Sequence, residues 1–493
     1  MIFDDYVSHD ALGLAALVAS GQVSAEQLLQ AAIRRADEVD PRINAVVKRL
    51  DAHARRETVA PRPGPFCGVP FLLKDLMADY GGETTSGGCR LLADFVPTQD
   101  SELVRRYRAA GLIVFGKTNT PEFGLTPFTE PLLFGPTRNP WNLDHTPGGS
   151  SGGSGAAVAA GIVPMASGGD GGGSIRIPAS CNGLVGLKPS RGLTPSGPDR
   201  GESWWGFSAE HVLTRSVRDC AAALDATAGP DAGCPYFTSP APGYLQALSE
   251  APPRLRIAFS SKPLVGRTMH PECVRGLEHT VQLLLSLGHE VEEAAPVVER
   301  EAFIQAFVVM LAAETAGYLA YIARNLGRAL DRGKIEPATL ALARIGRAVS
   351  GEDVTLARYF FASLTRRIGR WFEHYDMLLT PTLGMPPFRI GALQADFIER
   401  LQLGLVNRLP IAGLIKSGTL LQQVAEKSMD WIPNTPVFNV TGQPSISLPL
   451  HWSDDGLPVG MMFTARLADD TRLLQLSAQL EQAQPWFGRR APL

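Results

Sequence analysis

The stretch TPGGSSGGSGAAVAAG, residues 146–161, is the starting point for reading the fold of this 493-residue chain. Glycine and serine fill most of its first ten positions, and alanine and valine follow abruptly. Such composition is typical of flexible linkers and tight turns. However, a second run, SGGDGGGS at 167–174, follows after one helix-like and one strand-like segment. Two glycine loops joined by ordered elements indicate backbone amides that converge on a common point.

The segments around these glycine runs alternate between strand-like and helix-like patterns. GVPFLL (68–73) is apolar like a buried strand, and SELVRRYRAAG (101–111) is amphipathic like a helix. Strand-like LIVFG (112–116) follows the second of these, and SGAAVAAG (154–161) leads in the same way to IVPMA (162–166). This alternation predicts an α/β layered fold with a buried sheet.

The remaining elements are predicted from capping signals and apolar periodicity. Ser24 and Gln27 have the spacing of a capping box, which predicts a helix from there through Glu38. In the second half we expect strands at 255–260, 289–293, 376–382 and 459–465, and helices starting near Pro271 and spanning Glu301–Arg328, Asp353–Tyr375 and Asp470–Ala483. No internal repeat, charge block or long linker interrupts the chain. We therefore expect one domain over residues 1–493.

Composition excludes several classes of function. A net charge of -3 does not favour a nucleic acid or an anionic membrane as partner, so a small-molecule substrate is expected. The first twenty residues lack the pattern of a secretory signal, and no apolar run reaches eighteen residues, so we expect a soluble, cytoplasmic protein without membrane contact. Six scattered cysteines indicate free thiols, and no metal-binding motif or cofactor motif calls for a metal or a cofactor.

Two catalytic motifs match the sequence by pattern but not by context. Residues 148–152 fit the Gly-x-Ser-x-Gly elbow of α/β-hydrolases, yet the preceding WNLDHTP is not the buried strand that an elbow follows. Residues 111–118 fit the phosphate-loop pattern Gly-x-x-x-x-Gly-Lys-Thr, yet LIVF in its middle is itself strand-like. Pro121 also blocks the helix that should follow. We therefore expect neither an elbow nor a nucleotide site.

Ser174, at the end of the second glycine run, is the candidate nucleophile. A serine hydroxyl needs a base, and a lysine can serve when burial keeps it neutral. Lys74 directly follows the apolar run GVPFLL, where burial lowers the pKa of a lysine. The structural alternative is a lysine that extends to solvent and pairs with Asp75.

Six motifs distributed over the chain resemble the amidase signature family. In chain order they are GVPFLLKDL (68–76), GKTNTPEFG (116–124), GGSSGGSGAAVAAG (148–161), GGDGGGSIRIPAS (168–180), GLVGLKPSRG (183–192) and PVFNVTGQPSISLPL (436–450). The resemblance implies an α/β/α sandwich around a large mixed sheet, with a catalytic signature region at about 66–200 and a variable helical excursion at about 300–430.

The resemblance also implies an amide hydrolase with a Ser-Ser-Lys catalytic set. Ser174 matches the nucleophile, Ser150 the serine after an unusual cis peptide bond, and Lys74 the base. The expected oxyanion hole consists of backbone amides, and three further side chains are expected to support the site. The amides are those of Gly171, Gly172, Gly173 and Ser174, and the supporting residues are Ser151, Asp170 and Arg176.

This chain departs from the family pattern beside Asp170. The family commonly has a hydroxyl residue before this aspartate and often another after it, whereas this chain has Gly169 and Gly171. The loop is therefore expected to rely more on Asp170 and Arg176, which either form an ion pair or leave Arg176 facing solvent.

The substrate is the least determined feature. TRNPWNL (137–143) and QLEQAQPWFGRRAPL (479–493) resemble the branch of 6-aminohexanoate cyclic-dimer hydrolases, which act on nylon oligomers. A general aliphatic or aryl amidase or a carbamate hydrolase is the alternative, and a non-catalytic subunit with this fold is a third. The apolar stripe in FIQAFVVMLAAETAGYLAYIA (303–323) fits either a pocket wall or an ordinary core helix. The oligomeric state is open, with a homodimer among the options.

Overall fold

A single mixed sheet forms the centre of the molecule. The computed structural model describes residues 3–394 and 419–493. Within them, the strands form an 11-stranded sheet in the order β1-β3-β2-β4-β6-β5-β10-β11-β9-β7-β8. The strands are β1 Val46–Arg49, β2 Pro70–Lys74, β3 Ile113–Thr118, β4 Met165–Asp170, β5 Val185–Lys188, β6 Ala209–Thr214, β7 Arg256–Phe259, β8 Glu290–Glu293, β9 Met377–Pro381, β10 Ser445–Trp452 and β11 Pro458–Ala465.

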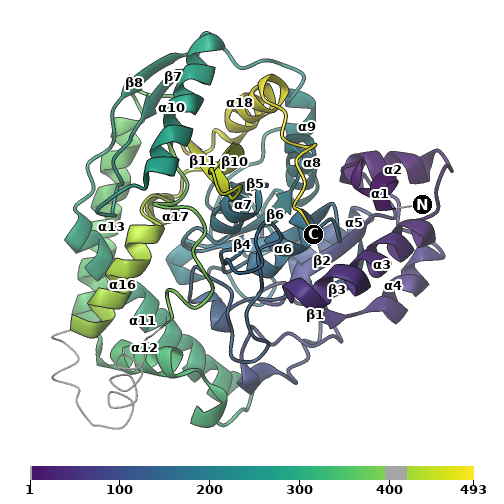
Figure 1. Cartoon of the computed structure of the whole chain (residues 1–493). Helices are drawn as coiled ribbons and strands as arrows, with labels where there is room; N and C mark the ends of the chain where they lie inside the picture. The colour runs from purple at the N-terminus through teal and green to yellow at the C-terminus, as the bar shows by residue number, and fades with distance from the viewer. Residues whose placement is uncertain (1–2, 395–418) are drawn as a thin grey trace.

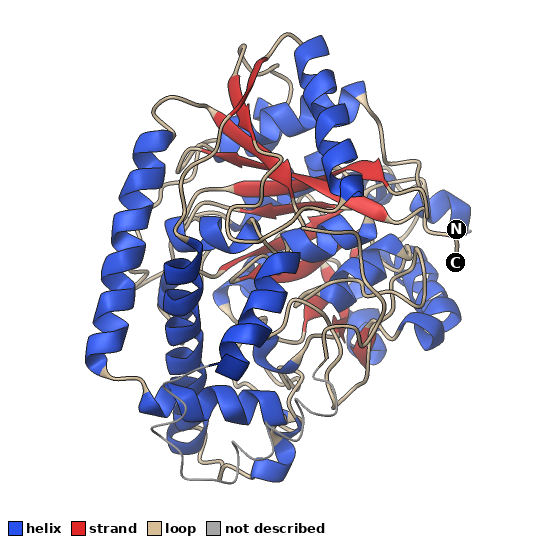
Figure 2. Cartoon of the chain, turned by 60° about the vertical axis from the view of Figure 1, so that its left-hand side comes forward, coloured by secondary structure: helices blue, strands red, loops and turns tan. Residues whose placement is uncertain are grey.

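Helices cover both sides of this sheet, as Figure 2 shows, so the expected α/β sandwich with a mixed central sheet is confirmed. The helices are α1 Phe3–Val7, α2 Ala11–Ala19, α3 Ala25–Ile43, α4 Asp51–Thr58, α5 Glu102–Ala109, α6 Gly152–Ala159, α7 Arg176–Asn182, α8 Val217–Thr227, α9 Tyr244–Ala247, α10 Pro271–Ser286, α11 Arg300–Asn325, α12 Pro337–Ala348, α13 Gly351–Trp371, α16 Thr419–Trp431, α17 Thr435–Thr441 and α18 Asp470–Ala483 (Figure 1). Short 3-10 turns occur at Arg90–Leu92, Glu122–Gly124, Trp204–Gly206 and Arg332–Lys334.

The predicted capping box of α3 is present. The Ser24 hydroxyl accepts the amide of Gln27 at 3.1 Å, and the Gln27 side chain accepts the amide of Ser24 at 2.8 Å. The helix continues to Ile43, beyond the predicted end at Glu38. The closing helix α18 has the predicted bounds.

The strands alternate their side chains between two cores. Along β11, Met461 and Phe463 lie in a core with residues of α8, α10 and α18. Met462, between them, lies in the opposite core with residues of α11, α13 and α17. Because successive strand residues point to opposite faces, a strand covered on both sides reads as one apolar run.

The two glycine runs are only partly loops, which corrects the sequence prediction. Gly152 and Gly153 open α6, and residues 167–170 belong to β4. These glycines serve close packing of ordered elements. A Cβ atom on Gly153 would lie 2.4 Å from the backbone nitrogen of Asn119, and one on Gly168 would lie 2.8 Å from Leu213. Side chains at these positions would separate the elements, which explains the composition.

The helix α11 was predicted over 301–328 and is found over Arg300–Asn325. Among the described residues, it is the one helix long and apolar enough to cross a membrane. In this fold it packs against α12, α13 and α16. The rest of the expected excursion continues through α12 and α13 to α16, but residues 395–418 lie outside the described part of the chain.

The N-terminal helix α1 and the C-terminal segment lie on one side of the molecule, where Phe3, Asp4 and Leu493 line the same pocket. The Arg215 guanidinium donates to the carbonyl of Val7 at 2.6 Å and to that of Phe487 at 2.8 Å. Arg490 lies 3.6 Å from the Asp4 carboxylate. Arg215, in the loop between β6 and α8, thus holds the N-terminal helix and the C-terminal segment together.

Candidate active site

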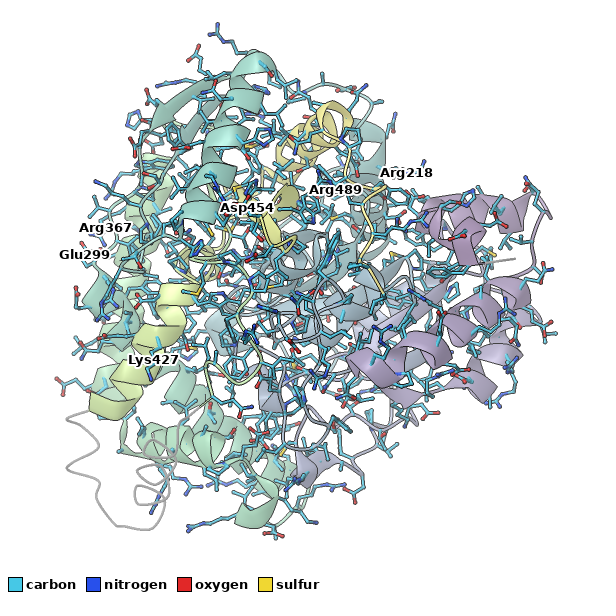
Figure 3. All side chains as sticks on the ribbon, viewed as in Figure 1. Arg218, Glu299, Arg367, Lys427, Asp454 and Arg489 are labelled. Atoms are coloured by element: carbon cyan, nitrogen blue, oxygen red, sulfur yellow. The ribbon has the colours of Figure 1, made fainter. Side chains whose placement is uncertain are left out.

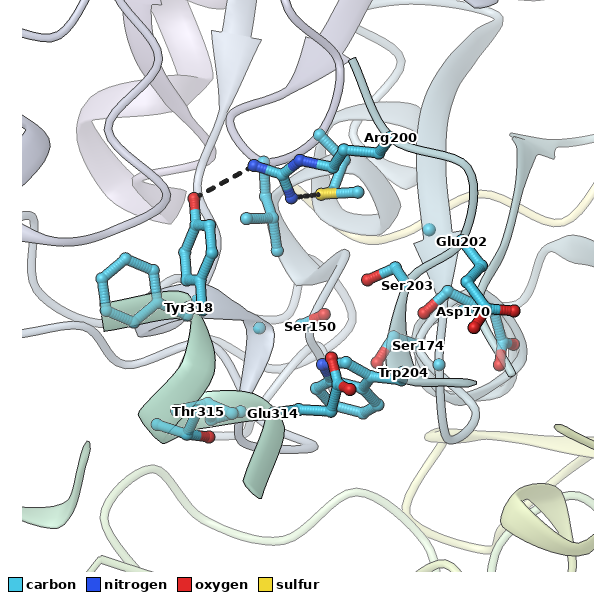
Figure 4. Close-up of a pocket in the computed structure, with 18 of the residues that line it drawn as sticks. Ser150, Asp170, Ser174, Arg200, Glu202, Ser203, Trp204, Glu314, Thr315 and Tyr318 are labelled. Atoms are coloured by element: carbon cyan, nitrogen blue, oxygen red, sulfur yellow. Dashed lines mark hydrogen bonds between the residues drawn. The ribbon is translucent and has the colours of Figure 1, made fainter. Parts of the chain in front are cut away.

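A cavity of about 290 Å³ opens at the ends of β2 and β4 (Figure 4). Parallel neighbours end at the same edge of a sheet, and β2 pairs in parallel with β4 through Leu72 and Ala166. Lys74, the last residue of β2, and Asp170, the last of β4, therefore reach the same place. Ser150 and Ser174 come to this edge from the loops before α6 and α7.

The two predicted serines and the predicted lysine are together in this cavity. Lys74 Nζ donates to Ser150 Oγ at 2.8 Å and to the carbonyl of Gly169 at 3.3 Å. Ser150 is preceded by a cis peptide bond from Gly149, as the resemblance implied. Ser174 also lines the cavity and is largely buried, with 8% of its surface exposed.

The environment of Lys74 favours a neutral amine. Burial lowers the pKa of Lys74 to about 8, and the negative charges of Glu210 and Asp170 oppose this shift. Asp75 does not pair with it. Instead, the Asp75 carboxylate accepts the hydroxyl and the amide of Ser86 and lies 3.9 Å from Lys117. The alternative of a solvent-facing Lys74 paired with Asp75 is therefore wrong.

Two other lysines are equally buried but serve elsewhere. Lys117, in the pattern that mimics a phosphate loop, lies within β3 and donates to Thr85 Oγ1 at 2.5 Å. This confirms the strand predicted in place of a nucleotide loop. Lys188 donates to the carbonyl of Pro189 at 2.7 Å, and burial, with the nearby charge of Arg176, lowers its pKa to about 7. Only Lys74 among these three contacts a serine of the cavity.

Residues 140–149 form no strand, so Gly148–Gly152 is not a nucleophile elbow. Ser151 instead ties the first glycine run to β4. Its hydroxyl accepts the amide of Gly169 at 3.2 Å and donates to the Gly169 carbonyl at 3.3 Å. Ser151 is fully buried, which fits a supporting role.

Asp170 and Arg176 form an ion pair with no exposed side-chain surface, so Arg176 does not face solvent. Two guanidinium nitrogens reach the carboxylate at 2.9 and 2.8 Å. Burial alone would raise the pKa of Asp170, but Arg176 and the amide of Asn439 hold it well below its usual value. Asn439, from the motif PVFNV, donates to both the carboxylate and the carbonyl of Asp170. Its role is not evident from the sequence, because 269 residues separate the two.

The Asp170 carboxylate also organises the loop that carries Ser174, the predicted nucleophile. It accepts the amides of Gly173 at 2.6 Å and Ile175 at 3.1 Å. The amide of Gly173, expected in the oxyanion hole, is thus engaged inside the protein. Among the described residues, the amides of Gly171, Gly172 and Ser174 have no such acceptor. A Cβ on Gly171 would lie 2.8 Å from the Trp204 ring, so glycine is needed there.

The cavity walls come from segments without a motif signal. Helix α11 contributes Glu314, Thr315 and Tyr318, so this helix is both a core helix and a pocket wall. Arg200 lies opposite, donating to Met77 Sδ at 2.7 Å and to the Tyr318 hydroxyl at 3.3 Å (Figure 4). The loop 200–208 and β6 supply the other charged and aromatic residues, which are Glu202, Trp204 and Glu210. Within residues 3–394 and 419–493, no group of three or more His, Cys, Asp or Glu side chains is arranged to hold a metal ion.

The amidase family model matches residues 27–474. The chain therefore belongs to the amidase signature family, and it is an amide-hydrolysing enzyme.

Two relatives and two solved structures illustrate which proteins this chain is similar to. The 6-aminohexanoate-cyclic-dimer hydrolase of Paenarthrobacter ureafaciens is 36% identical over 98% of this chain and 96% of its own length. AmiC of Mycobacterium leprae, which is named as an amidase, is 39% identical over 97% and 95%. The structure of a 6-aminohexanoate cyclic dimer hydrolase with substrate matches with a TM-score of 0.88 at 36% identity, covering 99% of both chains. A bacterial aryl acylamidase matches with a TM-score of 0.84 at 28% identity, covering 98% and 99%.

Proposed function

We propose that this amidase uses Ser174 as nucleophile, Ser150 as proton relay and Lys74 as base, through an acyl-enzyme. The observation that carries the proposal is the 2.8 Å hydrogen bond between Lys74 Nζ and Ser150 Oγ in the same cavity as Ser174. A lysine with a pKa of about 8 has an appreciable neutral fraction near neutral pH.

Each step moves a proton along this line of groups. Neutral Lys74 takes the proton of Ser150, which takes that of Ser174 as its oxygen bonds to the amide carbonyl carbon. The negative oxygen that develops is held by the amides of Gly171, Gly172 and Ser174, each worth about 3 kcal/mol of barrier. The C–N bond then breaks, and the departing amine receives the proton back through Ser150. Water adds to the acyl-enzyme by the same route and releases the acid and Ser174.

For the substrate, we propose 6-aminohexanoate cyclic dimer or a related nylon oligomer. The relative of that name at 36% identity and the motifs at both ends of the chain support it. An aliphatic or aryl amidase is the alternative, supported by the aryl acylamidase neighbour. A carbamate hydrolase belongs to the same alternative, because a serine nucleophile attacks a carbamate carbonyl as it attacks an amide carbonyl. We expect the enzyme in the cytoplasm.

Substitution of the catalytic groups tests the mechanism. Ser174→Ala should abolish amine release and labelling by a fluorophosphonate, because the nucleophile is gone. Lys74→Ala should lower kcat by about 10³-fold or more. Full activity in either variant contradicts the mechanism, and labelling that persists in Ser174→Ala identifies another nucleophile. Failure of the native protein to react with the reagent contradicts Ser174 as the nucleophile.

A substrate panel tests the specificity. Amine release is measured from the cyclic dimer, the linear dimer, a simple aliphatic amide and an anilide, each with Ser174→Ala as control. Preference for the cyclic dimer supports the nylon-oligomer proposal. Turnover of the aliphatic amide or anilide alone assigns the enzyme to the alternative and leaves the mechanism intact.

A further inference from the structure

Glu210 is a carboxylate of the cavity that the proposed mechanism does not use. It lies on β6, directly opposite Gly169 of β4 in the antiparallel ladder, and lines the same cavity as Lys74 and Ser174. Its carboxylate makes no hydrogen bond or ion pair with any described residue. Glu210 is partly buried, and because a carboxylate with little water around it and no hydrogen-bond partner is costly, its presence beside the reacting groups needs a reason.

The space for Glu210 exists because residue 169 is glycine. A Cβ atom on Gly169 would lie 2.3 Å from Glu210 Oε1 and 2.6 Å from Oε2. Any side chain at 169, including the hydroxyl residue of the family pattern, would displace this carboxylate. The glycine at position 169, where the family pattern has a hydroxyl residue, is thus what allows the Glu210 carboxylate to take this position.

Gly169 also places Glu210 next to the base. Its carbonyl accepts from Lys74 Nζ at 3.3 Å, while its missing side chain leaves room for the carboxylate. The charged groups that face Glu210 are Lys74 from β2, Asp170 from β4 and Arg200 from the loop before β6. Asp170 is already neutralised by Arg176, and Arg200 keeps its charge but acts on Glu210 less strongly than Lys74 does. Lys74 is therefore the partner whose charge Glu210 is placed to influence.

We propose that Glu210 is a positioning residue for the catalytic base, and that its carboxylate, in the space left by Gly169, controls the protonation of Lys74. This inference rests on the proposed Ser174–Ser150–Lys74 mechanism. It does not require Glu210 to contact substrate.

The sign of the effect follows from the charges. Burial raises the pKa of Glu210 to about 8, against the charge of Lys74, so the two groups titrate in the same range as one pair. A negative Glu210 holds the proton on Lys74 and raises its pKa. Removing that charge lowers the pKa of Lys74, so the neutral base forms at lower pH. The rate increases with pH as Lys74 loses its proton, and this rising limb should move toward acid.

The experiment measures the rate of fluorophosphonate labelling of Ser174 against pH, which requires no knowledge of the substrate. Glu210→Gln should move the rising limb to lower pH by about 1 unit or more, as expected when a nearby opposite charge is removed. Glu210→Asp, which keeps the charge, should stay close to the native profile. If the Gln variant does not fold, Glu210→Ala removes the charge without placing an amide in the cavity.

Glu481→Gln is the matched control. Glu481 of α18 is another partly buried glutamate, with a pKa raised to about 7 by burial, but it accepts the amide of Val217 at the start of α8 and does not line the cavity that contains Ser174. Its substitution should leave the limb in place. An unchanged limb in the Gln variant, a shift toward alkali, or an equal shift in Glu481→Gln overturns the inference. Absence of any Ser174-dependent labelling overturns the proposed function instead.

Discussion

Asp170 and Arg176 form a solvent-free ion pair next to the loop that carries Ser174. Asp170→Asn leaves the Arg176 charge buried without its counter-charge, which typically costs about 3–5 kcal/mol. We therefore expect the free energy of unfolding in urea to decrease by that amount. A decrease below about 1 kcal/mol would contradict the inference that Asp170 compensates the buried charge of Arg176.

Arg367 and Glu299 provide the control at the surface. They form a two-point ion pair between α13 and the residue before α11, at the left edge of Figure 3. Their side chains are 36% and 46% exposed, so solvent replaces the contact when it is lost. Arg367→Ala should cost at most about 1 kcal/mol in the same measurement.

At the residue scale, the sequence predicts the proposed base Lys74 only through its motif. Burial after an apolar run is shared by Lys74, Lys117 and Lys188, so the physical argument for a low pKa applies to all three. What distinguishes Lys74 is its contact with Ser150, which depends on the parallel pairing of β2 and β4. No sequence pattern predicts the position of Glu210 in the cavity, because that position depends on the glycine opposite it in another strand.

At the element scale, the contact between α11 and α12 is set by one glycine. A Cβ atom on Gly346 of α12 would lie 1.9 Å from the carbonyl oxygen of Ala312 in α11. Ala313, Glu314 and Thr315, the next residues of α11, line the cavity. Pushing the helices apart should therefore disturb both stability and substrate binding.

Gly346→Ala should lower the free energy of unfolding by about 1–3 kcal/mol, as overpacking does, and raise KM. Gly369→Ala, inside α13, is the matched control because nothing lies within 4 Å of its added Cβ. There alanine should stabilise by about 0.5–1 kcal/mol and leave KM unchanged. The free energy of unfolding and KM are measured for both variants by thermal unfolding and steady-state kinetics. Equal changes in the two variants would contradict the packing argument.

Regular elements are where the sequence is most informative, since helix α18 and the box of α3 follow from local signals. The glycine runs mislead because the same composition serves loops and close packing, and only the neighbouring strand or helix distinguishes them. The wall formed by Arg200, Trp204 and Glu210 has no periodic pattern from which it could be predicted.

At the scale of the whole molecule, the order of the strands is not readable from the chain. β6 lies between β4 and β5, and β10 and β11 lie between β5 and β9. Such pairings depend on contacts between residues far apart, such as Asn439 with Asp170, which no local pattern encodes. The prediction of one domain agrees with a sheet that runs through the molecule, but it stays a prediction.

Arg215 holds Val7 and Phe487 together. We therefore expect that the chain can begin at a different residue and still form the same contacts. A short glycine-serine linker from Leu493 to Phe3 would join neighbouring segments, because both residues line one pocket. New ends can then be opened between Ala232 and Gly233, in an exposed turn. We expect this circular permutant to fold and to retain fluorophosphonate labelling at Ser174. Its failure to fold would mean that the order of synthesis, and not only the set of contacts, is needed to build this sheet.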